Sequence, residues 1–434
     1  MLIYTIAVAL TLAAVAWLYP GREMEEIGEA GLKGKKGPAG IILTADIRKK
    51  LILSCIVAMI PFLAVMSVRW NVGVDTWFTY TPEYLAKKSE TIPLTAEEEQ
   101  IMQVDYQLLG RMFYDYTADE AVQKQTLADA YPFYRESWHH TGIGFRLLQQ
   151  LLIYLHADVQ WLYFATSLLI LGFTFAAIWQ QSTKPLLACL FFVITANFFL
   201  AMNIVSQYIA IAICLFACAF AEKRKPVWFF LLVGLAAAFH ISALVFLPVF
   251  FLPRLKIRPL WCVAAVVAAL LIAWLVFPLI NTKLVEMIAP QYVRHFREGT
   301  VFETVFFAIG CAVLALGTYY FKKGSEHPYF RLWYYMNVLG LIALAFSGTI
   351  PLVKRINYYY AAPHFLMIPM LMNLEEDKKR RVSLQILTIG LFTAQILVAI
   401  WHMNKHATLP YRAFFQGDRL EMTLSMLDHI PGLW

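Results

Sequence analysis

The sequence predicts an all-α fold, a polytopic integral membrane helical bundle of about 11–13 transmembrane or half-spanning helices. Of its 434 residues, 60% are hydrophobic and 15% are charged, whereas soluble domains carry about 25% charged residues. The hydrophobic residues gather in runs long enough to cross a hydrocarbon core, which takes about 20 residues per helix. The alternating strand pattern of outer-membrane barrels is absent. Helices are therefore the expected way to satisfy the backbone in lipid.

We expect the whole chain, residues 1–434, to form one polytopic membrane domain. The first apolar run lacks a basic leader and a small-residue cleavage site, so it is interpreted as a span and not as a signal peptide. The runs that predict crossings are, in chain order, residues 2–18, 51–68, 162–179, 185–203, 209–221, 260–280, 301–321, 329–350, 359–372 and 384–401.

The basic residues predict the orientation of these crossings, because Lys and Arg favour cytoplasmic loops. The basic clusters lie within residues 33–50, 223–225, 254–258, 322–323 and 378–381. With all five inside, both chain ends lie outside. The soluble parts are then a cytoplasmic linker at residues 20–50, a long extracytoplasmic loop at 69–158 and an extracytoplasmic tail at 404–434.

Residues 227–252 must begin and end on the same side, because basic clusters flank both ends. The segment is short for two full crossings, so we expect a tight or re-entrant hairpin whose outer apex lies near His240 and Ser242. By the same parity, residues 185–221 go out and return, with an external turn near Asn203 to Gln207.

The long loop differs in charge from the rest of the chain. Residues 69–158 hold 13 acidic and seven basic residues, with amphipathic stretches that would suit external or interfacial helices. The net charge of +7 therefore reflects the cytoplasmic clusters. It does not indicate nucleic acid as a partner, since no basic patch interleaved with aromatic residues stands on a soluble domain.

Charged groups at membrane depth cost roughly 2.5–3.5 kcal/mol each, so those present ask for a reason. Arg69 and Asp75 directly follow the second span, and an interfacial anchor is the alternative role for Arg69. Asn203 and Gln207 stand four residues apart at an external turn. His240 marks the hairpin apex, where simple packing is its alternative role.

Two further places carry cations or histidines. Lys354 and Arg355, followed by Tyr358, lie in an external turn against the positive-inside trend, which suggests an anion to bind. Paired histidines can bind metal, but no third ligand stands at a defined spacing, so neither a metal site nor a cofactor is predicted and a divalent-metal requirement stays open. This last group is Arg135, His139 and His140.

A carboxylate, a histidine and two arginines at one face would suit group transfer from a phosphate-bearing donor. Arg binds phosphate bidentately, and Asp or His can deprotonate an acceptor hydroxyl. No DxD motif for nucleotide sugars is apparent, which favours a lipid-linked donor.

Four motifs, in order along the chain, resemble the EpsG family of Wzy-like polysaccharide polymerases. The family usually carries Arg directly before the glutamine of the second motif, where this chain has Ser206, so Lys354 or Arg135 would have to supply that cation. The motifs are RWNVGVDT at 69–76, NIVSQ at 203–207, FHISALVFLP at 239–248, and Arg355 with Tyr358.

The resemblance implies a GT-C-like glycosyltransferase, multi-pass in the bacterial inner membrane, with its active site facing outside or the periplasm. It would polymerise undecaprenyl-pyrophosphate-linked oligosaccharide repeat units for an exopolysaccharide, capsule or O-antigen. Its partners would be this substrate, membrane lipid, a flippase and a chain-length regulator. Asp75 and His240 would be catalytic, with either as the base. The implied substrate-binding residues are Arg69, Arg135, His140, Asn203, Gln207, Lys354, Arg355 and Tyr358.

Two other classes of function stay open. A lipid-linked oligosaccharide flippase or transporter would show ionisable residues across the bilayer midplane and often repeated halves, and neither is visible. A polymer ligase or an O-acyltransferase would work at the same face. A ligase would also share the donor, so the sequence does not separate it from a polymerase.

Overall fold

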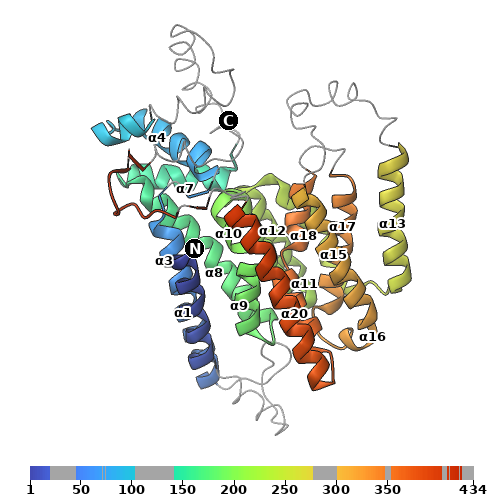
Figure 1. The fold of residues 1–434 in the computed structure, drawn as a ribbon. Coiled ribbons are helices and arrows are strands. Elements are labelled where there is room, and N and C mark those ends of the chain that lie inside the picture. Colours follow the sequence, from blue (N-terminus) through green and yellow to red (C-terminus); the bar gives the residue numbers. More distant parts are fainter. Residues whose placement is uncertain are drawn as a thin grey trace.

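The chain forms a bundle of helices in the computed structural model (Figure 1). The structure describes residues 1–19, 45–70, 72–73, 75–102, 141–276, 301–347, 353–402, 408–409, 411–419 and 421–422. Within these ranges the regular structure is helical, apart from one isolated antiparallel bridge between Arg69 and Ala413. The predicted all-α fold is confirmed.

The helices differ in whether they are long enough to cross a membrane alone. Four in the described ranges are long and apolar enough: α3 (Ala45–Val68), α8 (Val159–Gln181), α11 (Val205–Glu222) and α20 (Lys378–Leu397). The bent pair α9 (Pro185–Ile194) and α10 (Asn197–Asn203) is a fifth candidate. Shorter apolar helices stand among them, namely α1 (Leu2–Leu18), α12 (Pro226–Phe239), η3 (Ile241–Arg254), α13 (Pro259–Val276), α15 (Val301–Tyr319), α17 (Phe330–Ala345) and α19 (His364–Asn373).

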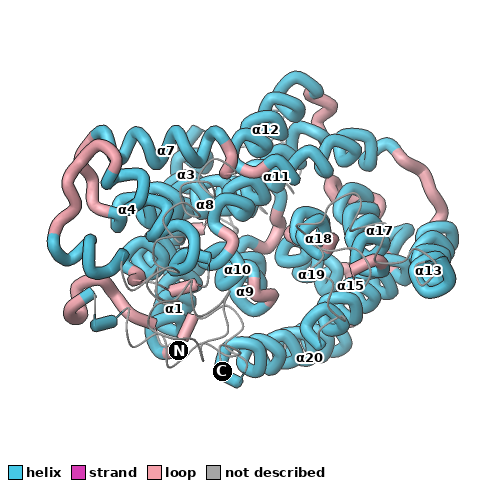
Figure 2. Tube along the Cα trace, turned by 90° about the horizontal axis from the view of Figure 1, so that it is seen from above, coloured by secondary structure: helices cyan, strands magenta, loops and turns pink. Residues whose placement is uncertain are grey.

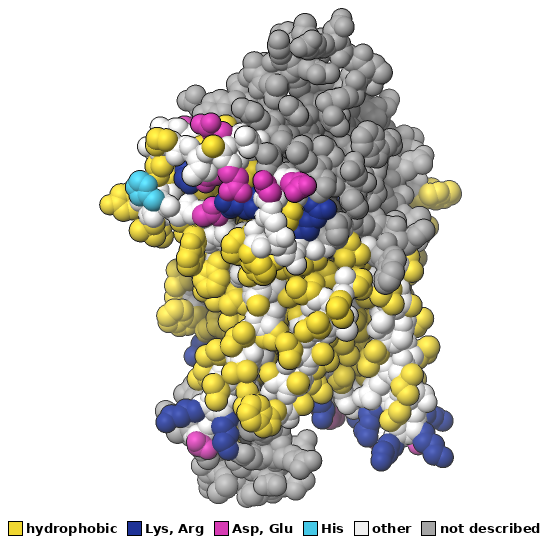
Figure 3. All heavy atoms as spheres, turned by 60° about the vertical axis from the view of Figure 1, so that its left-hand side comes forward, with side chains coloured by type: hydrophobic (Ala, Val, Ile, Leu, Met, Phe, Trp, Pro, Cys, Tyr) yellow, Lys and Arg dark blue, Asp and Glu magenta, His cyan; other side chains and the backbone are white. Residues whose placement is uncertain are grey.

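The two ends of the bundle differ in the charged side chains that they carry. On the face shown in Figure 3, Lys and Arg predominate below a hydrophobic belt, whereas most Asp and Glu lie above it together with some Lys and Arg. We call the lower end, which holds the start of α20, the basic end. The upper end, which holds α4 (Thr81–Ser89) and α7 (Ile143–Tyr154), is the loop end. This segregation is what the positive-inside pattern of the sequence leads us to expect.

The apolar run at 185–203, predicted as one continuous span, is broken in the structure. α9 and α10 meet at an angle of 56°, because Ala196 adopts a left-handed conformation with φ of 65°, a costly one for a residue with a Cβ. Side chains support the break. The Thr195 hydroxyl donates to the Phe191 carbonyl (2.5 Å), and the Asn197 amide donates to the Thr195 hydroxyl (2.9 Å).

The hairpin expected over residues 227–252 forms, with His240 at its apex. α12 ends at Phe239, and η3, a 3₁₀ helix, begins at Ile241; the two pack on each other and on α11. At the far end of the hairpin, Glu222 lies within electrostatic reach of Arg224 and Arg254. Both arms therefore return to the basic end.

Burial is greatest in the middle of the bundle. In α11, 83% of the membrane-spanning window is buried, whereas in α20 only 17% is buried. Figure 2 shows α20 and α13 at the edge of the bundle. α11 is also in contact with α8, α12 and η3. These contacts fix the position of α11, whose first residues form part of the candidate site.

Candidate functional site

Asp75 is placed by a glycine turn that docks on the end of α10. Gly73 has φ of 106°, and a Cβ there would lie 2.4 Å from the carbonyl oxygen of Met202. That carbonyl accepts a hydrogen bond from the Thr76 hydroxyl (2.9 Å), and the backbone N–H of Asp75 donates to Asn203 Oδ1 (2.9 Å). Only glycine allows this close approach. The turn therefore fixes the backbone position from which the Asp75 side chain extends.

Asp75 is half-buried, and its carboxylate lies within electrostatic reach of the Arg355 guanidinium. Arg355 lies on α18 (Lys354–Ala361), a helix that starts at the loop end. Burial raises the pKa of Asp75 to about 6, and the positive charge of Arg355 opposes that rise. A carboxylate with such a pKa is ionised at neutral pH and still basic enough to accept a proton.

The start of α11 joins these two segments. Gln207 is 2% exposed, and its Nε2 donates to the backbone carbonyl of Arg355 (3.0 Å). Its neighbour Ser206 contacts Tyr80 of the π-helix η2 (Thr76–Tyr80): the Tyr80 and Ser206 hydroxyl oxygens lie 3.3 Å apart. Ser206, where the family resemblance expects Arg, thus serves as a hydrogen-bond partner for the segment that follows Asp75.

His240 is held by a chain of hydrogen bonds that reaches across the bundle. Its Nδ1 lies 2.6 Å from the Ser242 hydroxyl, which lies 3.0 Å from the Tyr359 hydroxyl. Tyr359 is 1% exposed and also bonds to Gln207. Burial, and then the charge of Arg355, lower the pKa of His240 to about 4. The ring is therefore neutral at pH 7. Nδ1 is bonded to Ser242, so Nε2 is the ring nitrogen that can contact a substrate.

The structure brings five of the predicted site residues together and leaves others apart. Lys354 is half-buried next to Arg355, and Tyr358 lines a groove one turn further along α18. The predicted ligands Arg135 and His140 lie outside the described residues. The residues brought together are Asp75, Asn203, Gln207, His240 and Arg355.

Ser242 and Tyr359 are the residues that the sequence analysis did not assign to the site. Both lie inside noted segments, Ser242 two residues after His240 and Tyr359 within the run of tyrosines after Arg355. The link between them spans 117 residues of chain. That link, and which tyrosine of the run faces the histidine, cannot be read from one sequence.

Arg69 makes none of these contacts and lies in a pocket of tyrosines, one of which, Tyr80, is also within electrostatic reach of Asp75. Its side chain is fully buried, and its three guanidinium nitrogens have no hydrogen-bond partner among the residues that the structure describes. The guanidinium carbon is 5.6 Å from the centre of the Tyr163 ring. Burial lowers the pKa of Arg69 to about 10, while the nearby hydroxyls of Tyr163, Tyr411 and Tyr4 oppose that change. The side chain remains a cation at neutral pH.

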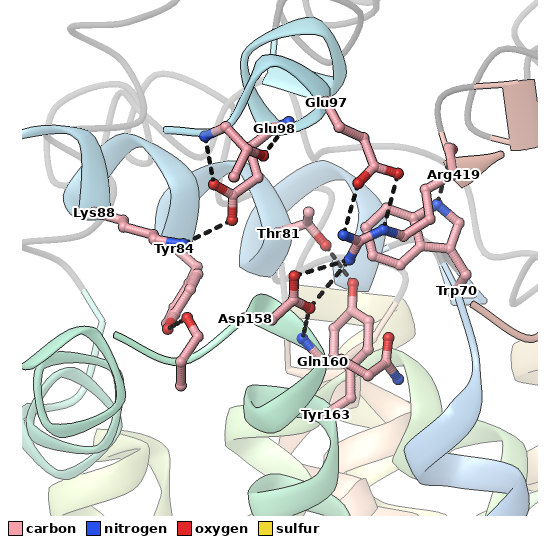
Figure 4. Close-up of polar contacts among 12 residues, drawn as sticks. Trp70, Thr81, Tyr84, Lys88, Glu97, Glu98, Asp158, Gln160, Tyr163 and Arg419 are labelled. Atoms are coloured by element: carbon pink, nitrogen blue, oxygen red, sulfur yellow. Dashed lines mark hydrogen bonds and ion pairs between the residues drawn. The ribbon is translucent and has the colours of Figure 1, made fainter. Parts of the chain in front are cut away.

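A cluster that we call the clasp joins the C-terminal segment to the long loop (Figure 4). It consists of Trp70, Glu97, Asp158 and Arg419. The Arg419 guanidinium binds Glu97 (2.8 Å) and Asp158 (3.0 Å) and lies 4.9 Å from the centre of the Trp70 ring. The Trp70 indole N–H donates to the Arg419 carbonyl (3.1 Å). The clasp includes Trp70, the residue that follows Arg69, and both of its carboxylates are already paired with Arg419.

Nothing in the described ranges resembles a metal centre, since no three His, Cys, Asp or Glu side chains there lie close enough to share an ion. The five residues of the site instead offer one carboxylate, one neutral imidazole, one guanidinium and two amides. That set can accept a proton, bind an anionic phosphate and orient sugar hydroxyls.

Comparison with known protein families gave a match. The model of the EpsG family matches residues 51–413, which include every residue of the site and Arg69. Comparisons with curated proteins and with solved structures gave no match. Because the matched range covers most of the chain, the predicted resemblance to this family is confirmed, and the chain belongs to the EpsG family of polysaccharide-polymerase-like membrane proteins.

Proposed function

We propose that the chain is a polysaccharide polymerase that joins lipid-pyrophosphate-linked oligosaccharide repeat units at its loop end. The observation that carries this proposal is the meeting of Asp75, His240 and Arg355 around the start of α11. These three side chains come from segments far apart in the sequence. They combine a base, a neutral imidazole and a phosphate-binding cation in a chain of the EpsG family.

The reaction would proceed as a displacement at the anomeric carbon of the donor sugar. Asp75 takes the proton from an acceptor hydroxyl of the incoming unit, whose oxygen then bonds to the anomeric carbon. The bond from that carbon to the pyrophosphate oxygen breaks, and the lipid pyrophosphate leaves with the electron pair. Arg355 neutralises the charge that develops on the leaving group. The proton on Asp75 passes to solvent.

His240 would orient the acceptor, and the side-chain amides of Asn203 and Gln207 would hold Asp75 and Arg355 in place. With Nδ1 bonded to Ser242, the ring presents Nε2, which can bind a hydroxyl of the acceptor. Asn203 fixes the backbone of Asp75, and Gln207 fixes the backbone of Arg355. The base and the phosphate ligand are thus held by one pair of amides at the junction of α10 and α11.

The loop end would face away from the cytoplasm. The Lys and Arg clusters at the other end of the hydrophobic belt support this orientation (Figure 3). In a bacterium this is the outer face of the inner membrane, where the units would supply an exopolysaccharide, a capsule or an O-antigen.

The test is an in vitro reaction of purified chain with synthetic undecaprenyl-pyrophosphate-linked repeat units, read as a ladder on a gel. We expect wild type to give a ladder and Asp75→Asn to lower the rate by about 10²–10⁴-fold, the usual contribution of a general base. Glu99→Gln makes the same chemical change on an exposed carboxylate of the same end and should leave the rate unchanged.

Two results would overturn the proposal. A single addition to a different acceptor, without a ladder, would identify a ligase. Transport of intact units across a vesicle membrane without any bond formation would identify a flippase. A full ladder from Asp75→Asn would leave the polymerase in place and remove Asp75 as its base.

A further inference from the structure

An apolar groove lies beside the candidate site and has no part in the chemistry described so far. It runs between α10, α15, α18, α19 and α20 and encloses about 500 Å³ of empty space, including its open side. Its apolar walls are formed by Leu200, Phe306, Ile309, Ala361, Ala362 and Phe392.

We propose that this groove binds the isoprenoid chain of the lipid-linked substrate, starting with the units next to the pyrophosphate. The proposal rests on the proposed function, because it takes a polyprenyl pyrophosphate as the substrate. It adds a site for the lipid, separate from the residues that act on the sugar.

Most of the polar residues that line the groove form hydrogen bonds with other protein groups. Asn197 Oδ1 accepts from the Tyr208 hydroxyl (2.9 Å), and its amide nitrogen donates to Thr195. His364 Nε2 lies 2.8 Å from Asn337 Oδ1. Because these polar groups already have hydrogen-bond partners, they do not require a polar ligand. The surface that remains is mostly hydrocarbon, which suits an apolar chain.

Charge complementarity at one end of the groove selects a lipid with an anionic head. Lys354, Tyr358 and Ala361 follow the helical spacing of four and three residues, so they share one face of α18. Tyr358 and Ala361 line the groove. Lys354, seven residues before Ala361, stands about 10 Å nearer the loop end, next to Arg355. A pyrophosphate held by this pair would place its first isoprene units between Tyr358 and Ala361.

The groove also has a wall through which a long chain could reach the bilayer. Phe392 belongs to α20, the helix at the edge of the bundle of which only 17% is buried (Figure 2). Phe306 and Ile309 belong to α15. A chain that leaves between α15 and α20 stays among apolar side chains, so the rest of an undecaprenyl tail can remain in lipid.

The direct test is photo-crosslinking of the wild-type chain with a polyprenyl pyrophosphate that carries a diazirine on its first isoprene unit. We expect labelled peptides from α15, α18 and α20, and competition by unlabelled undecaprenyl pyrophosphate but not by excess phosphatidylglycerol. Labels elsewhere would overturn the proposal. So would equal competition by phosphatidylglycerol, which would mean that the groove takes any membrane lipid.

A second test uses kinetics. Ala361→Phe, which fills the groove, should raise the KM for an undecaprenyl-linked unit about tenfold, the loss of one or two methylene contacts, with kcat unchanged. The KM for a unit whose pyrophosphate carries no isoprenoid chain should not change. Leu391→Phe, at a lipid-facing position of α20, is the matched control. An unchanged KM in a folded Ala361→Phe variant would contradict the proposal.

The two proposals can fail separately. Cross-linking needs no polymer, so groove labelling without a ladder would refute the polymerase and retain the lipid site. A ladder without groove labelling would do the reverse.

Discussion

Arg69 and Arg355 both stand at the loop end, but in opposite surroundings. Arg355 is half-buried, acts on the Asp75 carboxylate and the His240 ring, and has its backbone carbonyl held by Gln207. Arg69 is fully buried, faces tyrosine rings, and pairs through its backbone with Ala413 of the C-terminal segment. In the proposed reaction Arg355 binds the pyrophosphate, whereas the observed contacts of Arg69 are with tyrosine rings and the C-terminal segment.

The contrast shows how one short motif can serve two purposes. Arg69 and Asp75 are six residues apart, yet the turn at Gly73 sends the chain from the clasp to the end of α10. Arg69 and Trp70, before the turn, bind the C-terminal segment. Asp75, after the turn, forms part of the candidate site. The family motif therefore does not by itself make Arg69 a phosphate ligand.

The largest expected difference is between the two arginines themselves. Arg355→Met should lower kcat by about 10²–10³-fold, because the leaving pyrophosphate loses its charge partner. Arg69→Met should change kcat by less than about tenfold and leave Tm unchanged or higher, since an apolar side chain can replace a buried unpaired charge without loss. Initial rates of ladder formation and thermal unfolding in detergent measure both. An equal loss of activity in a folded Arg69→Met would place Arg69 among the phosphate ligands.

A smaller effect is expected for the groups that orient His240. Ser242→Ala removes the hydroxyl bonded to Nδ1 and should lower kcat about tenfold with little change in KM or Tm, as for other residues that orient a functional histidine. Ser325→Ala, at the basic end, is the control. If Ser242→Ala lowers Tm and leaves kcat intact, His240 has a packing role only.

The smallest effect is expected in the clasp, and it should be on stability. Arg419→Met breaks ion pairs whose carboxylates are more than a third exposed, so the loss should be about 1 kcal/mol after solvent screening. Tm should fall by about 2 °C and kcat should stay the same. Arg258→Met, an exposed cation at the basic end, provides the comparison. A loss of activity without a loss of Tm would tie the clasp to catalysis.

Hydropathy and charge predicted the bundle, because a helix that crosses lipid needs a continuous run of apolar residues, which is visible in the sequence. The run at 2–18 became α1 with the same bounds, and the parity of basic clusters placed His240 at a hairpin apex. The break at Ala196 was not predicted. No Pro or Gly marks it, and it depends on hydrogen bonds from Thr195 and Asn197.

The sequence predicted most residues of the candidate site but not the hydrogen bonds and ion pairs that join them. Asp75, Gln207, His240 and Arg355 stood out because polar groups are costly near the membrane. The Ser242–Tyr359 bond and the Arg419 clasp join segments more than a hundred residues apart. One sequence holds no local pattern for such pairs, so only the fold reveals them.

The pH dependence of kcat tests most directly whether Asp75 works as a base beside Arg355. Burial raises the carboxyl pKa to about 6 and Arg355 lowers it, so wild-type activity should fall as the pH drops through about 6 and Asp75 becomes protonated. In Arg355→Met the residual activity should show this acid limb at higher pH, and in Asp75→Asn the limb should vanish. An acid limb near pH 6 that persists in Asp75→Asn, or that stays in place in Arg355→Met, would contradict the account.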